Sequence, residues 1–74
     1  MLRASATPVD GTVRQEVVVD GRHVLHTDEP AGAGGTDSAA TPHELLAAAL
    51  AACISTMVVL AAHARGWPTA GLRV

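Results

Sequence analysis

The fold of this chain is decided by residues 41–66, TPHELLAAALAACISTMVVLAAHARG. This stretch opens with three residues that are typical of a helix start, Thr41, Pro42 and Glu44. The Thr41 hydroxyl can accept from the backbone N–H of Glu44, and the Glu44 carboxylate can reach back to the N–H of Thr41. Pro42 suits the first helical position, where a backbone N–H has no intrahelical partner. The sequence therefore predicts that a helix begins at Pro42.

The same stretch carries the signals of a helix end. Gly66 can adopt the left-handed conformation of a C-cap, Arg65 precedes it in the last turn, and Pro68 cannot continue a helix. Residues 42–65 are rich in Ala and Leu, which are strong helix formers, so they predict one helix about 36 Å long. Cys53, the only cysteine of the chain, lies in the middle of this helix.

Residues 1–27 predict an antiparallel β-meander. Its three strand-like segments are residues 2–9, 12–19 and 22–27. The pairs Asp10-Gly11 and Asp20-Gly21 separate these segments. Such pairs favour tight type I′ turns, because both central residues of that turn need positive φ.

A Gly- and Ala-rich loop, residues 28–41, joins the meander to the helix, and a loop of this length is usually functional or mobile. Residues 71–74 predict the start of a further strand. We therefore expect an α+β fold over residues 1–74, in which the antiparallel meander packs on one long central helix.

The composition predicts a thin hydrophobic core. The chain has 74 residues, no Phe, no Tyr and one Trp. A domain of this size buries only about 60% of its unfolded surface, and Ala offers little apolar area to bury. We therefore expect these residues to need a partner surface or to be part of a longer domain.

Charge and cysteine content exclude several function classes. The net charge is −2, with five arginines, no lysine and no basic run, which argues against nucleic-acid binding. A single cysteine excludes an internal disulfide framework and any CxxC site, and it fits a reducing, cytoplasmic setting. The N-terminal residues lead into a polar segment, so we expect no signal peptide.

The helix raises the possibility of a membrane span, because residues 45–62 are 18 uncharged residues in a row. This run is rich in Ala, has Ser55 and Thr56 at its centre, and has no aromatic belt before it. These features favour a buried core helix over a membrane span.

The four histidines do not predict a metal site. His23 and His26 would lie on opposite faces of a strand, and His43 and His63 lie near opposite ends of the helix. No phosphate-binding or dinucleotide-binding motif is present. We expect neither a metal ion nor a cofactor.

Helical spacing leaves two interpretations of Cys53. The apolar residues of one helix face, called the apolar stripe below, are Leu46, Leu50, Cys53, Met57 and Leu60. The opposite face holds Glu44, Ala48, Ala51, Ser55 and Ala62. Cys53 is then either a small hydrophobic residue that packs in the stripe, or a reactive thiol that needs an Arg or His brought near by the fold.

Specific motifs resemble the OsmC/Ohr family. They are Asp28-Glu29, Gly34-Gly35, the pattern TPxELLxAALxACxxT over residues 41–56, and the ending ARGW. The resemblance covers nearly the whole chain, as the N-terminal half of such a domain. It implies an intertwined homodimer whose strands wrap around long central helices.

The resemblance also implies an activity. In this family, a cysteine of the first helix attacks an organic hydroperoxide and becomes a sulfenic acid. A second cysteine then condenses with it, and an external thiol restores the enzyme. Cys53 matches the position of the first cysteine, and the implied partners are a small hydroperoxide and an external thiol reductant.

Three departures from the family pattern concern the site. No second cysteine is present, and Val9 stands where the activating arginine is expected, which leaves Arg14 and Arg22 as candidates. The family's Glu follows the helix-starting Pro directly. Here the candidate for that role is Glu44, which lies one step later, about 100° around the helix and opposite Cys53. The alternative is a non-catalytic binding or structural module in which Cys53 only packs.

Overall fold

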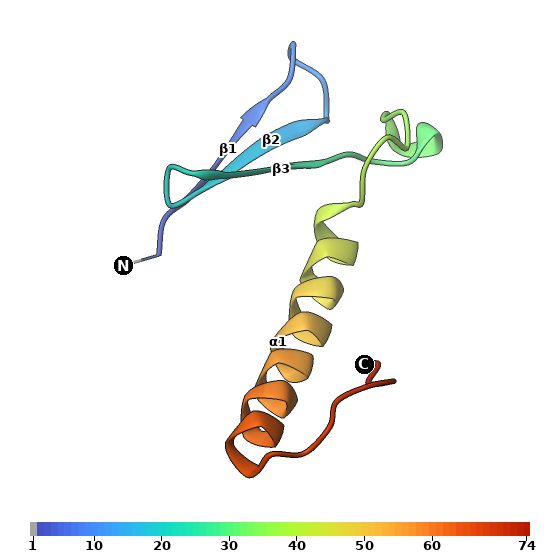
Figure 1. Ribbon diagram of the computed structural model, residues 1–74. Helices are drawn as coiled ribbons and strands as arrows, with labels where there is room; N and C mark the ends of the chain where they lie inside the picture. The colour runs from blue at the N-terminus through green and yellow to red at the C-terminus, as the bar shows by residue number, and fades with distance from the viewer. Residues whose placement is uncertain (1) are drawn as a thin grey trace.

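The computed structural model describes residues 2–74 as a small antiparallel sheet followed by one long helix (Figure 1). The elements are β1 (Ala4–Pro8), β2 (Gln15–Val19), β3 (His23–Thr27), the short 3-10 helix η1 (Ala31–Ala33) and α1 (Pro42–Arg65). The strand order is β1-β2-β3, with antiparallel pairing throughout. The predicted α+β class, a meander followed by a long helix, is confirmed.

Both Asp-Gly turns form as predicted. The φ angles of Asp10 and Gly11 are 50° and 72°, and those of Asp20 and Gly21 are 52° and 69°. Each turn is closed by a backbone hydrogen bond between residues three positions apart. These bonds run from Thr12 N to Val9 O (2.9 Å) and from Arg22 N to Val19 O (3.2 Å). Positive φ at two successive residues is what a type I′ turn requires.

The strands are shorter than the sequence predicts, most of all at the start of β2. Pairing with β1 begins only at Gln15, not at Thr12. The Thr12 hydroxyl donates to Val9 O (2.6 Å) and accepts from Arg14 N (3.2 Å), so local hydrogen bonds replace the ladder there. A threonine side chain that bonds to nearby backbone competes with strand pairing in this way.

The helix has the predicted bounds and the predicted caps. Thr41 Oγ1 accepts from Glu44 N at 3.0 Å, and Glu44 Oε1 accepts from Thr41 N at 3.0 Å, which completes the capping box. Gly66 has a φ of 68°, and its N–H donates to His63 O. The Arg65 guanidinium lies 5.3 Å from the centre of the Trp67 ring, a distance at which a cation is attracted to the ring face.

We expect Thr41→Ala to lower the free energy of unfolding by about 1 kcal/mol, because the first turn loses its capping hydrogen bond. Glu44→Ala should cost less, since the Thr41 hydroxyl still caps the turn. Urea denaturation of the two variants measures both effects. Unchanged midpoints in both would show that the capping box contributes nothing to the stability of α1.

The helix comes near the sheet only at its N-terminal end. Val17 and Thr27 of the sheet face Leu45 and Ala49 of α1 across a shared apolar pocket, and the rest of α1 leads away from the strands (Figure 1). The radius of gyration is 16.1 Å, against about 11 Å for a compact chain of this length. The expected packing of the meander along the helix is therefore not seen in residues 2–74, where the two elements share only this pocket at the first two turns of α1.

Most of α1 is not buried within this chain, contrary to the expectation of a core helix. Among the apolar residues that the structure describes, only Ala62 is buried, on the small-residue face. The apolar stripe is open, with Leu46 at 72% and Leu50 at 62% exposure. The physical reason is that residues 2–74 supply no second layer to cover it. By length and composition alone, α1 is also apolar enough to cross a membrane.

The predicted strand at residues 71–74 is absent. After α1 the chain turns back beside the helix, where Trp67 and Leu72 lie near Val58 and Ala62 (Figure 1). Gly71 has a φ of 84° and belongs to a turn, and the residues after it pair with no strand. A strand needs ladder hydrogen bonds from a neighbour, and in residues 2–74 no neighbouring strand lies there.

Candidate functional site

Cys53 is a free and exposed thiol on α1. It lies in the middle of the helix, about 16 Å along the axis from Pro42. In the part of the chain that the structure describes, no hydrogen bond or ion pair reaches its sulfur. Within a single chain, Cys53 is therefore open to solvent and to a reactant.

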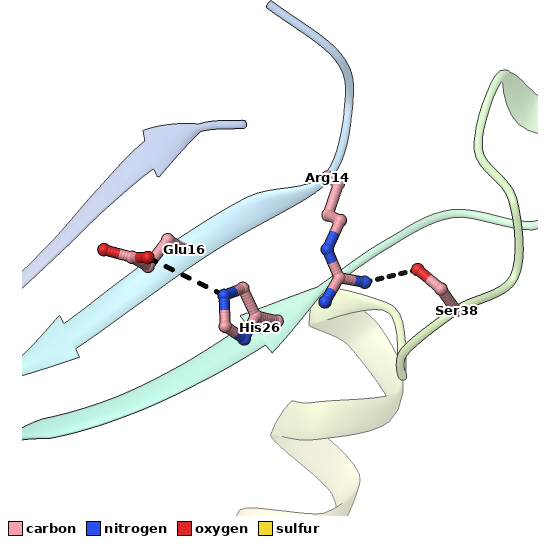
Figure 2. A network of polar contacts seen from close by, with 4 residues as sticks. All are labelled: Arg14, Glu16, His26 and Ser38. Atoms are coloured by element: carbon pink, nitrogen blue, oxygen red, sulfur yellow. Dashed lines mark hydrogen bonds and ion pairs between the residues drawn. The ribbon is translucent and has the colours of Figure 1, made fainter. Parts of the chain in front are cut away.

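The other predicted site residues do not gather around Cys53. Glu44 uses its carboxylate in the capping box at the start of α1. Arg22 lies in the exposed turn between β2 and β3. Arg14, just before β2, instead donates to Ser38 of the loop that leads into α1 (Figure 2). One chain thus holds the four predicted residues in four separate places.

An apolar pocket adjoins the helix face that carries Cys53. Its volume is about 390 Å³. Its lining residues are Ala6, Gln15, Val17, Thr27, Pro42, Leu45, Leu46 and Ala49. Because residues four apart lie one above the other on a helix, Cys53 follows Ala49 on the same face, one turn beyond the pocket. The pocket and the thiol therefore lie along the same side of α1.

A buried aspartate organises the loop between β3 and α1. Asp28 is only 1% exposed. Its Oδ1 accepts from Glu29 N at 2.8 Å. Its Oδ2 accepts from four donors, namely Thr36 N (3.2 Å), Thr36 Oγ1 (2.9 Å), Ser38 N (3.1 Å) and Ser38 Oγ (2.7 Å). A buried carboxylate with every oxygen hydrogen-bonded avoids the cost of an unpaired buried charge.

These hydrogen bonds hold the pKa of Asp28 far below its ordinary value. The hydrogen bond from the Ser38 hydroxyl is the largest cause, and the backbone N–H groups of Glu29 and Ser38 add to it, whereas burial acts in the opposite direction. Donors that point at the ionised form favour that form. Asp28 therefore keeps its negative charge across the ordinary pH range.

The backbone of the same loop is also tightly bonded. Gly35 N donates to Pro30 O, Asp37 N to Glu29 O, and Asp28 N to Ala40 O, at 3.0 to 3.1 Å. A Cβ at Gly35 would lie 2.0 Å from the carbonyl oxygen of Glu29, so only glycine fits there. The loop expected to be functional or mobile is thus a closed turn that is built around Asp28.

The sequence motifs do not mark Asp28 as a residue that organises the loop. The sequence nevertheless carries a signal for this turn. Thr36 and Ser38 follow Asp28 at eight and ten residues, and the Gly34-Gly35 pair lies between Asp28 and Thr36. Short polar side chains around a Gly pair favour a turn closed on a nearby carboxylate.

We expect Asp28→Asn to lower stability at neutral pH and to lose this effect in acid. The pKa of Asp28 is lower in the folded chain than the unfolded value of about 3.9, so its carboxylate stabilises the fold fully above about pH 5. This contribution disappears as the pH falls through the folded pKa. The stability difference between wild type and variant should therefore be constant from about pH 5 to pH 8 and shrink below about pH 4.

Urea denaturation at stepped pH measures this difference. Asp37→Asn is the matched control, because it removes the same charge from the same loop, and the Asp37 carboxylate accepts no hydrogen bond among residues 2–74. An Asp28→Asn variant as stable as Asp37→Asn at pH 7 would contradict the stabilising role of the Asp28 carboxylate.

The remaining ionisable groups form weaker contacts. Glu16 and His26 face each other across β2 and β3, with 3.8 Å between Oε2 and Nε2 (Figure 2). Both side chains are well exposed, so the pair adds little to stability. Within residues 2–74, no group of three or more His, Cys, Asp or Glu residues could hold a metal ion.

Comparison with known proteins relates the C-terminal part of the chain to one family. A family model described as OsmC-like protein matches residues 35–74, more than half of the chain. The matched residues include the helix start, Cys53 and the helix end. No curated protein and no solved structure matches the chain.

Proposed function

This chain belongs to the OsmC-like protein family, and we propose that it reduces organic hydroperoxides through the thiol of Cys53. The observation that carries this proposal is the exposed, free thiol on the helix that the family model matches. Cys53 is the only cysteine, so the chemistry has one candidate nucleophile.

The proposed reaction is a two-electron oxidation of Cys53. The thiolate sulfur attacks one oxygen of the hydroperoxide, the S–O bond forms, and the O–O bond breaks. Cys53 becomes a sulfenic acid, and the leaving alkoxide takes a proton to become an alcohol. Two molecules of an external thiol then return Cys53 to its thiol and release water and a disulfide. An external thiol supplies both electrons in this scheme, since residues 1–74 contain no second cysteine. A reducing, cytoplasmic setting would supply it.

The apolar pocket supports an organic rather than an inorganic peroxide. Its walls at Val17, Leu45 and Leu46 are apolar, and hydrogen peroxide has no apolar group to bury there. An alkyl chain in the pocket would direct its peroxide end along the helix toward Cys53. Burial of each methylene would stabilise the complex by about 0.8 kcal/mol.

A homodimer is part of the proposal. The accessible area of the chain is 5791 Å², against about 4,200 Å² for a compact monomer of this mass. The excess exceeds the roughly 800 Å² that each partner buries in a standard interface. A second copy that covers the apolar stripe would also bring a new set of side chains to Cys53. Arg14 is our candidate cation for the thiolate, because Ser38 holds it in place.

The alternative is a binding or structural module, and the apolar stripe favours it as much as it favours a dimer. Cys53 belongs to that stripe, and in the module the partner would cover the thiol as well, with no space left beside it for a peroxide. In that case Cys53 packs at an interface and performs no chemistry.

Peroxide stoichiometry tests the proposed function. Without external thiol, the protein should consume one equivalent of an alkyl hydroperoxide and then stop, with a sulfenic acid that dimedone traps at Cys53. Addition of a small dithiol should restart consumption. No consumption and no dimedone adduct in the native protein would support the module instead.

A further inference from the structure

Ser38 connects a buried negative charge to an arginine of a different segment. Its hydroxyl donates to Asp28 Oδ2 at 2.7 Å. A serine hydroxyl has only one proton to donate, so this contact leaves its oxygen as an acceptor only. Arg14 Nη1 donates to that oxygen (Figure 2).

The order of these contacts has an electrostatic consequence. A hydroxyl that donates to a carboxylate becomes a stronger acceptor, because hydrogen bonds in a chain polarise one another. A guanidinium is also a stronger donor than a neutral group. The three side chains therefore form a relay from a buried carboxylate through a hydroxyl to a cation.

We propose that Asp28 is a positioning residue that acts through Ser38 to fix the guanidinium of Arg14 beside the loop leading into α1. Asp28 sets the direction of the Ser38 hydroxyl, and the hydroxyl oxygen then orients Arg14. The relay ties the start of β2 to the loop, where the helix and sheet share few other contacts. The geometry of the relay follows from these contacts alone. Any effect of the relay on peroxide reduction depends on the proposed function.

The relay explains why the guanidinium of Arg14 is fixed by a side-chain hydrogen bond whereas that of Arg22 is not. Arg22 lies in an exposed turn and donates through no side-chain hydrogen bond among residues 2–74. Arg14 is half-buried at the loop. Its guanidinium keeps further N–H groups that Ser38 does not use, since Arg carries five such donors. An arginine fixed in this way presents those donors in one direction.

Hydrogen exchange at the guanidinium of Arg14 tests the relay in the full chain. In 15N-labelled protein, the Nη protons of Arg14 should exchange several-fold more slowly with water than those of Arg22, which serves as the internal reference. Ser38→Ala should raise the Arg14 rate to the Arg22 rate. Ser38→Thr keeps a hydroxyl and should keep the Arg14 rate slow.

Asp28→Asn decides whether the carboxylate acts at a distance. It removes the charge without touching Arg14, and the relay predicts faster exchange at Arg14, whereas Asp37→Asn in the same loop should leave it slow. Slow exchange at Arg14 in Asp28→Asn would overturn the relay.

Thr36→Val covers the case in which Asp28→Asn unfolds the loop. This variant weakens the loop by removing a different donor to the same carboxylate oxygen, and it leaves Ser38 intact. The relay predicts slow exchange at Arg14 in Thr36→Val. Fast exchange there would show that Arg14 depends on loop stability alone, which would also overturn the proposal.

Peroxide assays of the same variants separate this inference from the proposed function. If the relay serves catalysis, Ser38→Ala should slow peroxide consumption several-fold and Ser38→Thr should restore it. Faster exchange at Arg14 with an unchanged peroxide rate would contradict the catalytic role of the relay. A wild type that consumes no peroxide would instead contradict the proposed function, and the exchange rates would still decide the relay.

Discussion

Cys53→Ser should abolish consumption of organic hydroperoxide while leaving the fold intact. Serine is close to cysteine in size, but its hydroxyl is not a useful nucleophile toward a peroxide bond. Cys53 is exposed, so the substitution buries no polar group within the chain. Peroxide consumption and urea denaturation of the same preparation measure the two halves of this expectation.

The opposite pattern would show that Cys53 only packs. If a partner surface covers the thiol, the serine hydroxyl becomes buried and the assembly loses about 1–3 kcal/mol of stability. A variant of unchanged activity and lower stability would therefore contradict the peroxidase. Ser55→Ala is a suitable control, because it changes a small polar side chain on the opposite face of the same helix. It should leave peroxide consumption unchanged.

Leu50→Glu should convert a dimer into a monomer. Leu50 is 62% exposed in the single chain and lies in the middle of the apolar stripe. Loss of a buried leucine costs about 1.5–3 kcal/mol for each copy, and a two-fold dimer loses it twice. The dimer should therefore dissociate at concentrations about 100-fold higher, or more. Sedimentation at micromolar concentration measures this change.

Ala48→Glu is the matched control for the interface. It introduces the same side chain on the opposite face of α1, where Ala48 is exposed, and it should leave the dimer intact. A wild type that sediments as a folded monomer would rule out the homodimer. Equal dissociation in both variants would place the interface elsewhere than on the apolar stripe.

The interval from Pro42 to Arg65 and both of its caps followed from the sequence alone. The same holds for the two Asp-Gly turns, whose positive φ angles the residue pair predicts. The physical reason is that these features depend on hydrogen bonds between residues at most a few positions apart. A Thr three residues before a Glu can form a capping box in any tertiary context. The likeness to the OsmC-like family also came from such local patterns, and the family match confirms it.

The tertiary structure decided which side chains meet. Arg14 and Ser38 are far apart in the chain, and no periodicity predicts that a loop folded on Asp28 brings them together. For the apolar stripe, the sequence predicts which residues share a face but not whether that face is buried. Helical spacing identified Leu46, Leu50 and Cys53 as one face, but only the arrangement of the elements shows that the sheet lies near the first turns alone and that the face stays open. Burial depends on what the rest of the fold brings against a helix, and that is a property of the assembled structure and not of the helix sequence.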